Sequence, residues 1–147
     1  MNPPHPGIEH LQALADRNAF HRWLGMRIVA VEPDRIELTI AWREELVSNP
    51  QRQSTHGGIL ATLIDAAGDY AVATRAGEPV PTVDLRVDYH RTATPGDLRA
   101  MATLIHYGGT LASAETRVFD REDRMVASGR AVYFTGSLKG REGKSPA

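Results

Sequence analysis

The chain has 147 residues, the length of a single domain with one core. It carries 17 basic and 18 acidic residues, a formal net charge of −1 with no basic stripe, so a nucleic acid is not expected as a partner. It has no cysteine, which excludes disulfides, thiolate zinc ligands and a cysteine nucleophile.

The N-terminal segment has neither the basic region nor the apolar region of a secretory signal, and no apolar run approaches the roughly 20 residues of a membrane span. We therefore expect a cytoplasmic protein with no membrane partner. From residue 8 to residue 23, apolar side chains recur at near-helical spacing. This pattern predicts one short amphipathic helix that lies against the edge of the core.

Two strands are predicted next, over residues 24–31 and 35–42, because apolar and polar side chains alternate in the second and a Pro-Asp turn joins the pair. The polar residues 43–55 predict a loop, in which Ser54 or Thr55 is placed to cap the helix that follows.

The most apolar stretch of the chain predicts a long helix over about 56–75, ended by a segment that starts at Gly77. Four further strands are predicted at about 80–91, 97–107, 110–120 and 124–135, separated by turn-forming residues. The order of elements predicts an α+β domain in which an antiparallel sheet wraps around one central helix. The domain is expected to span residues 1–137, and the polar tail 138–147 is expected to be disordered.

A carboxylate stands inside the apolar helix. Gly58, Thr62, Asp65 and Asp69 are spaced four, three and four residues apart, so they share one face of the helix. Both carboxylates can lie on the solvent side of an amphipathic helix. Alternatively, Asp65 is kept in this apolar segment for chemistry, since burying an unpaired charge is costly. We favour the catalytic interpretation for Asp65 and the solvent side for Asp69.

The helix opens with Gly57 and Gly58, where backbone N–H groups lack intrahelical partners and lie at the positive end of the helix dipole. Such N–H groups can hold a developing oxyanion. His56 lies roughly two helical turns before Asp65, which is too far for both to act on one carbonyl. The distance requires a substrate that spans it, or two groups from different subunits.

Three interpretations stay open at this point. His56 can orient the loop or a ligand carbonyl, or it can be a solvated residue at a helix start. Asp65 and Asp69 could contribute to a metal site, but no third ligand has a suitable spacing, so no metal is expected. Thr82 heads the next strand on its polar side, where a role in the site and a plain surface position are both compatible with the sequence.

Residues 56–67, His-Gly-Gly-Ile-Leu-Ala-Thr-Leu-Ile-Asp-Ala-Ala, resemble the signature of the hotdog-fold acyl-CoA thioesterases of the phenylacetate-degradation type. The resemblance covers about residues 20–135 and includes Leu24-Gly25-Met26, the strand 83–89, the turn from Arg91 to Asp97, Gly108 with 110–112, and the segment 127–131.

The resemblance implies a hotdog fold, in which a six-stranded antiparallel sheet wraps around the long helix and a short N-terminal helix precedes it. It also implies a homodimer with active sites at the interface, usually within a homotetramer. In the roles that it implies, Asp65 is the general base or nucleophile, Gly57 is the backbone donor to the thioester carbonyl, His56 orients the loop and Thr82 positions water or the carboxylate.

The chain departs from the family pattern at two positions. An Asn is usual six residues before the His, where this chain has Pro50, and Asn49 takes that place only if the loop holds one extra residue. Gly109 stands where relatives commonly carry Lys or Arg, a possible contact to the phosphates of coenzyme A. The remaining candidates for binding the coenzyme A part are Gly58, Arg86 and Arg91, although the two arginines can equally be ordinary solvated strand residues.

The leading hypothesis is hydrolysis of an acyl- or aryl-coenzyme A to the free acid and coenzyme A, with no cofactor besides the coenzyme A of the substrate. One rival is a non-catalytic hotdog protein that binds acyl-CoA. The other is an enoyl-thioester hydratase, which would need a His and a carboxylate at one substrate. Since His90 and His106 fall on predicted strands away from Asp65, the hydratase is the weaker rival.

Overall fold

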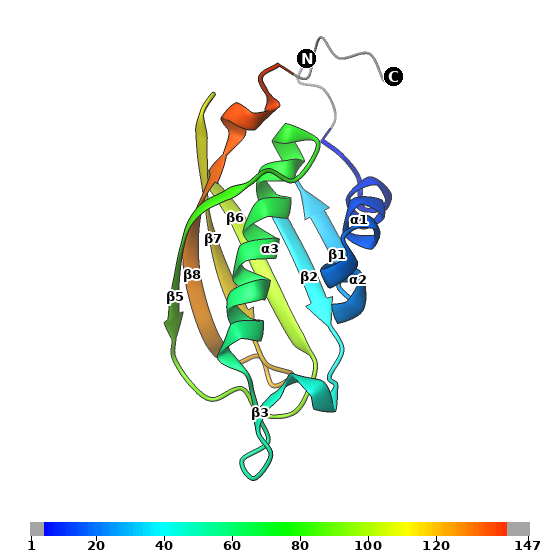
Figure 1. Ribbon diagram of the computed structural model, residues 1–147, viewed down its shortest axis with the longest axis vertical. Helices are drawn as coiled ribbons and strands as arrows, with labels where there is room; N and C mark the ends of the chain where they lie inside the picture. Colours follow the sequence, from blue (N-terminus) through cyan, green and yellow to red (C-terminus); the bar gives the residue numbers. More distant parts are fainter. Residues whose placement is uncertain (1–4, 141–147) are drawn as a thin grey trace.

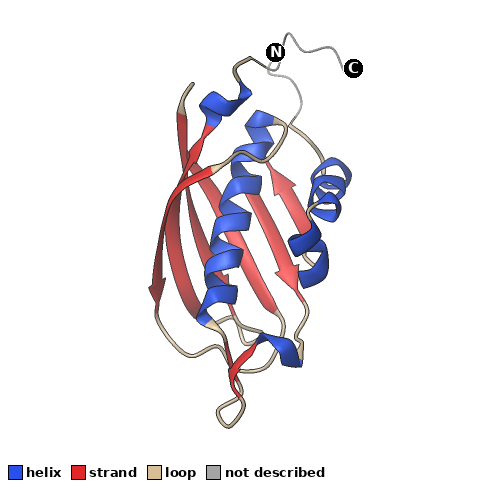
Figure 2. Ribbon diagram, viewed as in Figure 1, coloured by secondary structure: helices blue, strands red, loops and turns tan. Residues whose placement is uncertain are grey.

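A long helix, α3 (Gly57–Ala76), lies against one face of a six-stranded antiparallel sheet, as Figures 1 and 2 show. The computed structural model describes residues 5–140. The strands, in their order across the sheet, are β1 (Arg27–Glu32), β2 (Arg35–Ile40), β6 (Leu98–Tyr107), β7 (Leu111–Phe119), β8 (Met125–Phe134) and β5 (Thr82–Tyr89). The predicted α+β fold with one central helix is confirmed.

The core forms between α3 and the middle of the sheet. Leu63, Ile64 and Ala67 on α3 are fully buried, and the helix packs on β6, β7 and β8. His56 caps α3, because its Nδ1 atom accepts the N–H of Gly58 at 2.8 Å. The prediction that Ser54 or Thr55 provides this cap is therefore wrong.

The N-terminal region forms two helices, α1 (Ile8–Arg17) and α2 (Ala19–Leu24), beside β1. Asn18 separates them, since its extended backbone breaks the helix and its side chain caps α2 by accepting two N–H groups at 3.1 Å. The prediction of a single helix over 8–23 is wrong at this residue.

The predicted loop 43–55 contains short elements: a 3-10 turn, η1 (Glu44–Leu46), and a two-stranded ribbon of β3 (Val47–Asn49) and β4 (Ser54–Thr55). The ribbon extends from the end of the molecule where α3 begins (Figure 1). It leads the chain from the sheet to the start of α3.

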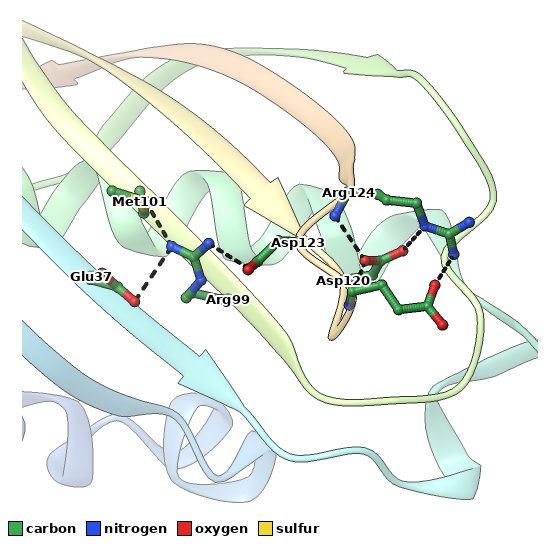
Figure 3. Close-up of polar contacts among 7 residues, drawn as sticks. Glu37, Arg99, Met101, Asp120, Asp123 and Arg124 are labelled. Atoms are coloured by element: carbon green, nitrogen blue, oxygen red, sulfur yellow. Dashed lines mark hydrogen bonds and ion pairs between the residues drawn. The ribbon is translucent and has the colours of Figure 1, made fainter.

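Charged residues link two neighbouring strands of the sheet and stabilise one of its turns. Figure 3 shows Arg99 on β6 between Glu37 on β2, at 3.5 Å, and Asp123 in the β7–β8 turn, at 3.0 Å. In the same turn, burial opposes the ionisation of Asp120. Hydrogen bonds from N–H groups of the turn and from the Arg124 guanidinium, 2.9 Å away, outweigh this effect of burial. Together they lower the pKa of Asp120. These contacts are structural and contribute no group to the site described below.

After β8 the chain forms a 3-10 turn, η2 (Thr135–Leu138), so it stays structured beyond Thr135. Leu138 packs partly on the core. Residues 141–147, most of the tail that was predicted to be disordered, lie outside the described residues. Among the helices that are described, none has the length and apolar character needed to cross a membrane.

Candidate active site

Asp65 is half-buried on α3 and is held by the first residue of β5. The Thr82 hydroxyl donates a hydrogen bond to Oδ1 of Asp65 at 2.6 Å. A charge-assisted bond of this length fixes the carboxylate and leaves Oδ2 available for another partner. The structure thus brings together Asp65 and Thr82, which the sequence places 17 positions apart.

Tyr133 on β8 holds the turn of α3 that carries Asp65. Its ring is fully buried, and its hydroxyl donates to the backbone carbonyl of Asp65 at 2.7 Å. Burial, reinforced by the charges of Asp65 and Asp69, raises the pKa of Tyr133 above its ordinary value. Tyr133 is therefore a neutral donor that holds the backbone of Asp65 in place.

Asp69, one turn further along α3, is not a solvent-side residue. Its Oδ1 accepts the backbone N–H of Val80 at 2.8 Å. Burial raises the pKa of Asp69 to about 7, the Val80 N–H opposes this shift, and the charge of Asp65 adds to it. The prediction that Asp69 lies on the wet face is wrong, because the segment that leads into β5 folds over it.

Gly57 begins α3 beside the other end of β5. The Tyr89 hydroxyl donates to the Gly57 carbonyl at 2.8 Å, and the Tyr89 ring lies 3.2 Å from the place where a Cβ on Gly57 would stand. Within the described residues, no hydrogen bond uses the Gly57 N–H. This N–H is therefore free to bind a ligand oxygen at the positive end of the helix.

A groove of about 290 Å³ opens beside Gly57, between the start of α3 and the segment that follows β5. Arg91 lines it, and its guanidinium forms no ion pair with any described residue. Thr55 also lines it, and the buried Oγ1 atom of Thr55 has no hydrogen-bond partner there. The groove thus offers the Arg91 cation and the N–H of Gly57 to a ligand.

His56 and Gly58, two of the predicted site residues, form a hydrogen bond with each other at the start of α3. His56 Nδ1 accepts the N–H of Gly58, which leaves Nε2 of His56 as the other polar atom of the ring. The Gly58 carbonyl accepts the Thr62 hydroxyl at 2.8 Å. The geometry suits an orienting role for His56, whereas the N–H of Gly58 is already used and cannot also bind a ligand.

Two other predicted residues are not brought to the site. The side-chain oxygen of Asn49 accepts the N–H groups of Gln51 at 2.9 Å and Arg52 at 3.2 Å, so it closes its own turn in the β3–β4 ribbon. The Arg86 side chain is 78% exposed and lies 3.6 Å from Asp88 on the same strand. Neither side chain forms a hydrogen bond or ion pair with Asp65 or Gly57, and the roles of Asn49 and Arg86 stay predictions.

The site residues form two separate halves on one chain. Asp65 with Thr82 marks the start of β5, and Gly57 with Tyr89 marks its end. Thr82 and Tyr89 would face opposite sides of a regular strand, but the pairing of β5 with β8 is irregular between Thr82 and Asp84. This irregularity turns both side chains toward α3. Along the helix the two halves are about 12 Å apart.

Comparison with known proteins identifies the family. The profile of the thioesterase superfamily matches residues 53–127, which hold both the start of α3 and β5. The chain belongs to the thioesterase superfamily. An X-ray structure of a protein described as from this superfamily is 56% identical, with a TM-score of 0.85 over 86% of this chain and 96% of that chain. The predicted family and hotdog fold are confirmed.

The chain is also similar to two proteins from Escherichia coli. The medium/long-chain acyl-CoA thioesterase YigI is 28% identical over 132 residues, 80% of this chain and 85% of the relative. The PaaI protein of the phenylacetic acid degradation operon is 23% identical, with a TM-score of 0.75 over 86% of this chain and 90% of that chain. The second likeness shows the fold alone.

Sequence reasoning on this thioesterase superfamily chain missed His21 on α2. Its Nδ1 lies 2.9 Å from the hydroxyl of Tyr70, which is buried on α3. Burial lowers the pKa of His21, and the negative charge of Asp65 partly offsets this. Only the near-helical spacing of apolar residues marked this segment, so no sequence signal pointed to a histidine near Asp65.

Proposed function

We propose that the protein hydrolyses the thioester of an acyl- or aryl-coenzyme A. The observation that carries the proposal is the Asp65 carboxylate, held at 2.6 Å by the Thr82 hydroxyl on a largely apolar helix of a thioesterase superfamily fold. The named activity of YigI supports acyl-CoA as the substrate class.

The two halves of the site meet if two chains pair through β5. This strand lies at one edge of the sheet, and Val83 (59% exposed) and Tyr89 (56% exposed) leave it uncovered in a single chain. In an antiparallel pair of β5 strands, Thr82 of one protomer lies opposite Tyr89 of its partner. Asp65 of one protomer then faces Gly57 of the partner, which removes the 12 Å separation along one helix.

In this arrangement the thioester carbonyl lies between the two chains. The Gly57 N–H donates to the oxygen that becomes negative as the carbonyl is attacked. Asp65 either takes the proton from an attacking water or attacks the carbonyl carbon itself. The tetrahedral intermediate then collapses, the C–S bond breaks, and the coenzyme A thiolate leaves and takes up a proton. On the general-base route this step gives the free acid directly. On the nucleophilic route it leaves an anhydride between the acyl group and Asp65, which a water molecule hydrolyses to the free acid and the Asp65 carboxylate.

The direct test is release of free coenzyme A thiol from a panel of short, long, branched and aryl acyl-CoAs. We expect turnover of at least one class by the wild-type protein and a loss of about 10³-fold or more in Asp65→Asn, which is nearly isosteric. Thr82→Val, which removes only the hydroxyl, is expected to lose less. Turnover that is equal in wild type and Asp65→Asn would contradict the proposal.

Binding of acyl-CoAs without thiol release would instead establish the non-catalytic rival. The position of His90 gives the hydratase no support, because the His90 ring bonds the Ser128 hydroxyl on β8 at 2.8 Å. Loss of the double bond of a crotonyl thioester on incubation would establish that activity in its place.

The pairing itself is tested with Val83→Glu, which places a charge on the exposed edge strand. We expect sedimentation velocity to show a shift from dimer, or from a larger even-numbered assembly, toward monomer, with loss of thiol release in parallel. The fold of each chain should persist, because Val83 is exposed in the single chain. A variant that is monomeric and fully active would contradict the shared site.

A further inference from the structure

A second cavity, of about 330 Å³, lies between the β6–β7 turn and η2, and the proposed catalytic groups do not use it. Figure 1 shows η2 as the orange-red turn at the end of β8. Its lining includes Tyr107, Gly108, Gly109, Thr135, Leu138 and Lys139. Lys139 is the only charged residue of the described lining, and no acidic side chain takes part in it.

The Lys139 ammonium lies over Gly109, in the turn between β6 and β7. Its Nζ atom is 3.4 Å from the position that a Cβ on Gly109 would take, so it occupies the space that a longer side chain at that position would use. In the part of the chain that the structure describes, no carboxylate lies within 4.0 Å of this ammonium. Its charge is therefore available to an external anion.

The turn beneath Lys139 adds backbone donors. The Gly108 N–H is bonded to the Leu111 carbonyl at 2.8 Å, but no hydrogen bond among the described residues uses the N–H of Gly109 or of Thr110. Gly109 lines the cavity beside the Lys139 ammonium, and a free backbone N–H next to a cation is suited to a phosphate oxygen. The Thr135 hydroxyl donates to the Gly108 carbonyl at 2.6 Å, which fixes η2 against the turn.

This cavity lies at the same end of β5 as the carboxylate half of the site. The Phe134 N–H donates to the Pro81 carbonyl at 2.8 Å, and Tyr133 is paired with Thr82. We propose that Lys139 and the N–H group of Gly109 bind a phosphate group of the coenzyme A part of the substrate. This inference rests on the proposed function and extends it to a named anion-binding subsite.

The experiment compares Lys139→Gln with wild type on two thioesters of the same acyl group, an acyl-CoA and the matching acyl-pantetheine, which has no phosphate. We expect the KM for the acyl-CoA to rise about three- to ten-fold at unchanged kcat, with no change for the acyl-pantetheine. Lys139→Arg should keep most of the affinity, and Arg17→Gln, at an exposed arginine on α1, serves as the charge-matched control. Equal changes for both thioesters, or no change for either, would overturn the subsite.

Calorimetric titration with free coenzyme A and with pantetheine separates this proposal from the catalytic one. The expected result is weaker binding of coenzyme A by Lys139→Gln, by the same three- to ten-fold factor, and unchanged binding of pantetheine. A wild-type protein that lacks turnover but binds coenzyme A through Lys139 would support the subsite and contradict hydrolysis. If the wild-type protein releases thiol and Lys139→Gln binds coenzyme A as tightly as wild type, the subsite alone is overturned.

Discussion

At the scale of single residues, the proposed mechanism gives one backbone group, the N–H of Gly57, the role of oxyanion donor. His56 before it has φ −60° and ψ 131°, a conformation that a following proline accepts, and proline is well suited to the first position of a helix. Gly57→Pro therefore deletes the N–H and preserves the start of α3. We expect a loss of about 10²- to 10³-fold in kcat, measured by thiol release.

Gly57→Ala is the matched control, since it adds the same Cβ against Tyr89 but keeps the N–H. It should lose far less activity than Gly57→Pro. Equal losses in the two variants would show that crowding of Tyr89, rather than the missing donor, causes the effect.

Asp69 gives a prediction about pH and stability. Its pKa of about 7 in the folded protein lies above its ordinary value of 3.8, so the folded state binds more protons than the unfolded state between these pH values. Stability from this group is full below about pH 4 and is lost as the pH rises through 7, by up to about 4 kcal/mol. Asp69→Asn keeps an acceptor for the Val80 N–H and removes the charge.

We expect thermal denaturation of Asp69→Asn to show a higher melting temperature than wild type at pH 8 and a smaller difference at pH 4. Glu45→Gln, at an exposed carboxylate on η1, should follow wild type at every pH. Curves for wild type and Asp69→Asn that stay parallel from pH 4 to pH 8 would contradict a raised pKa for Asp69.

The residue types of the site could be predicted from the sequence, but their contacts could not. The His-Gly-Gly entrance and the carboxylate at Asp65 carry the family resemblance in one contiguous segment. Periodicity alone placed Asp69 on the wet face, because it does not report that residues 80–82 cross over the helix. His21 and Lys139 reach the site region only through tertiary packing, so nothing local in the sequence marks them.

At the scale of elements, the close approach of α3 to β8 depends on Gly68. A Cβ at this position would meet the Tyr133 hydroxyl and lie 3.1 Å from the Tyr133 ring carbon that bears it. Because Tyr133 is fully buried, it has little room to move. We expect Gly68→Ala to lower the free energy of unfolding by about 1–3 kcal/mol and the melting temperature by about 3–10 °C.

The same variant should also reduce thiol release, since a displaced Tyr133 hydroxyl no longer holds the Asp65 backbone. Removing that hydroxyl in the double variant, Gly68→Ala with Tyr133→Phe, should recover part of the stability but not the activity. A Gly68→Ala protein as stable as wild type would mean that the packing of α3 on β8 is less tight than the structure indicates.

The sequence predicts the long helix and the sheet strands well because their apolar periods are sustained over many residues. The prediction fails where a single residue interrupts the periodic pattern of apolar side chains. Asn18 splits the N-terminal helix by capping α2, and the irregular pairing after Thr82 moves Val83 to the exposed side of β5. Local hydrogen bonding and strand irregularity are not encoded in an apolar pattern.

At the scale of the whole molecule, the proposed mechanism requires that two chains share each active site. One chain holds the Asp65–Thr82 half at the start of β5 and the Gly57–Tyr89 half at its end. A two-fold pair through the free edge of β5 brings each half to the complementary half of the partner, and it also covers the exposed apolar side chains of that strand.

The most direct test of this claim is complementation between two inactive variants, Asp65→Asn and Gly57→Pro, co-expressed with different tags and purified as the mixed assembly. A shared site predicts that the mixed dimer regains one intact site, with thiol release at about half of the wild-type rate per dimer, while each variant alone stays inactive. Mixed dimers that stay as inactive as either variant would contradict the shared site, because both halves would then have to come from one chain.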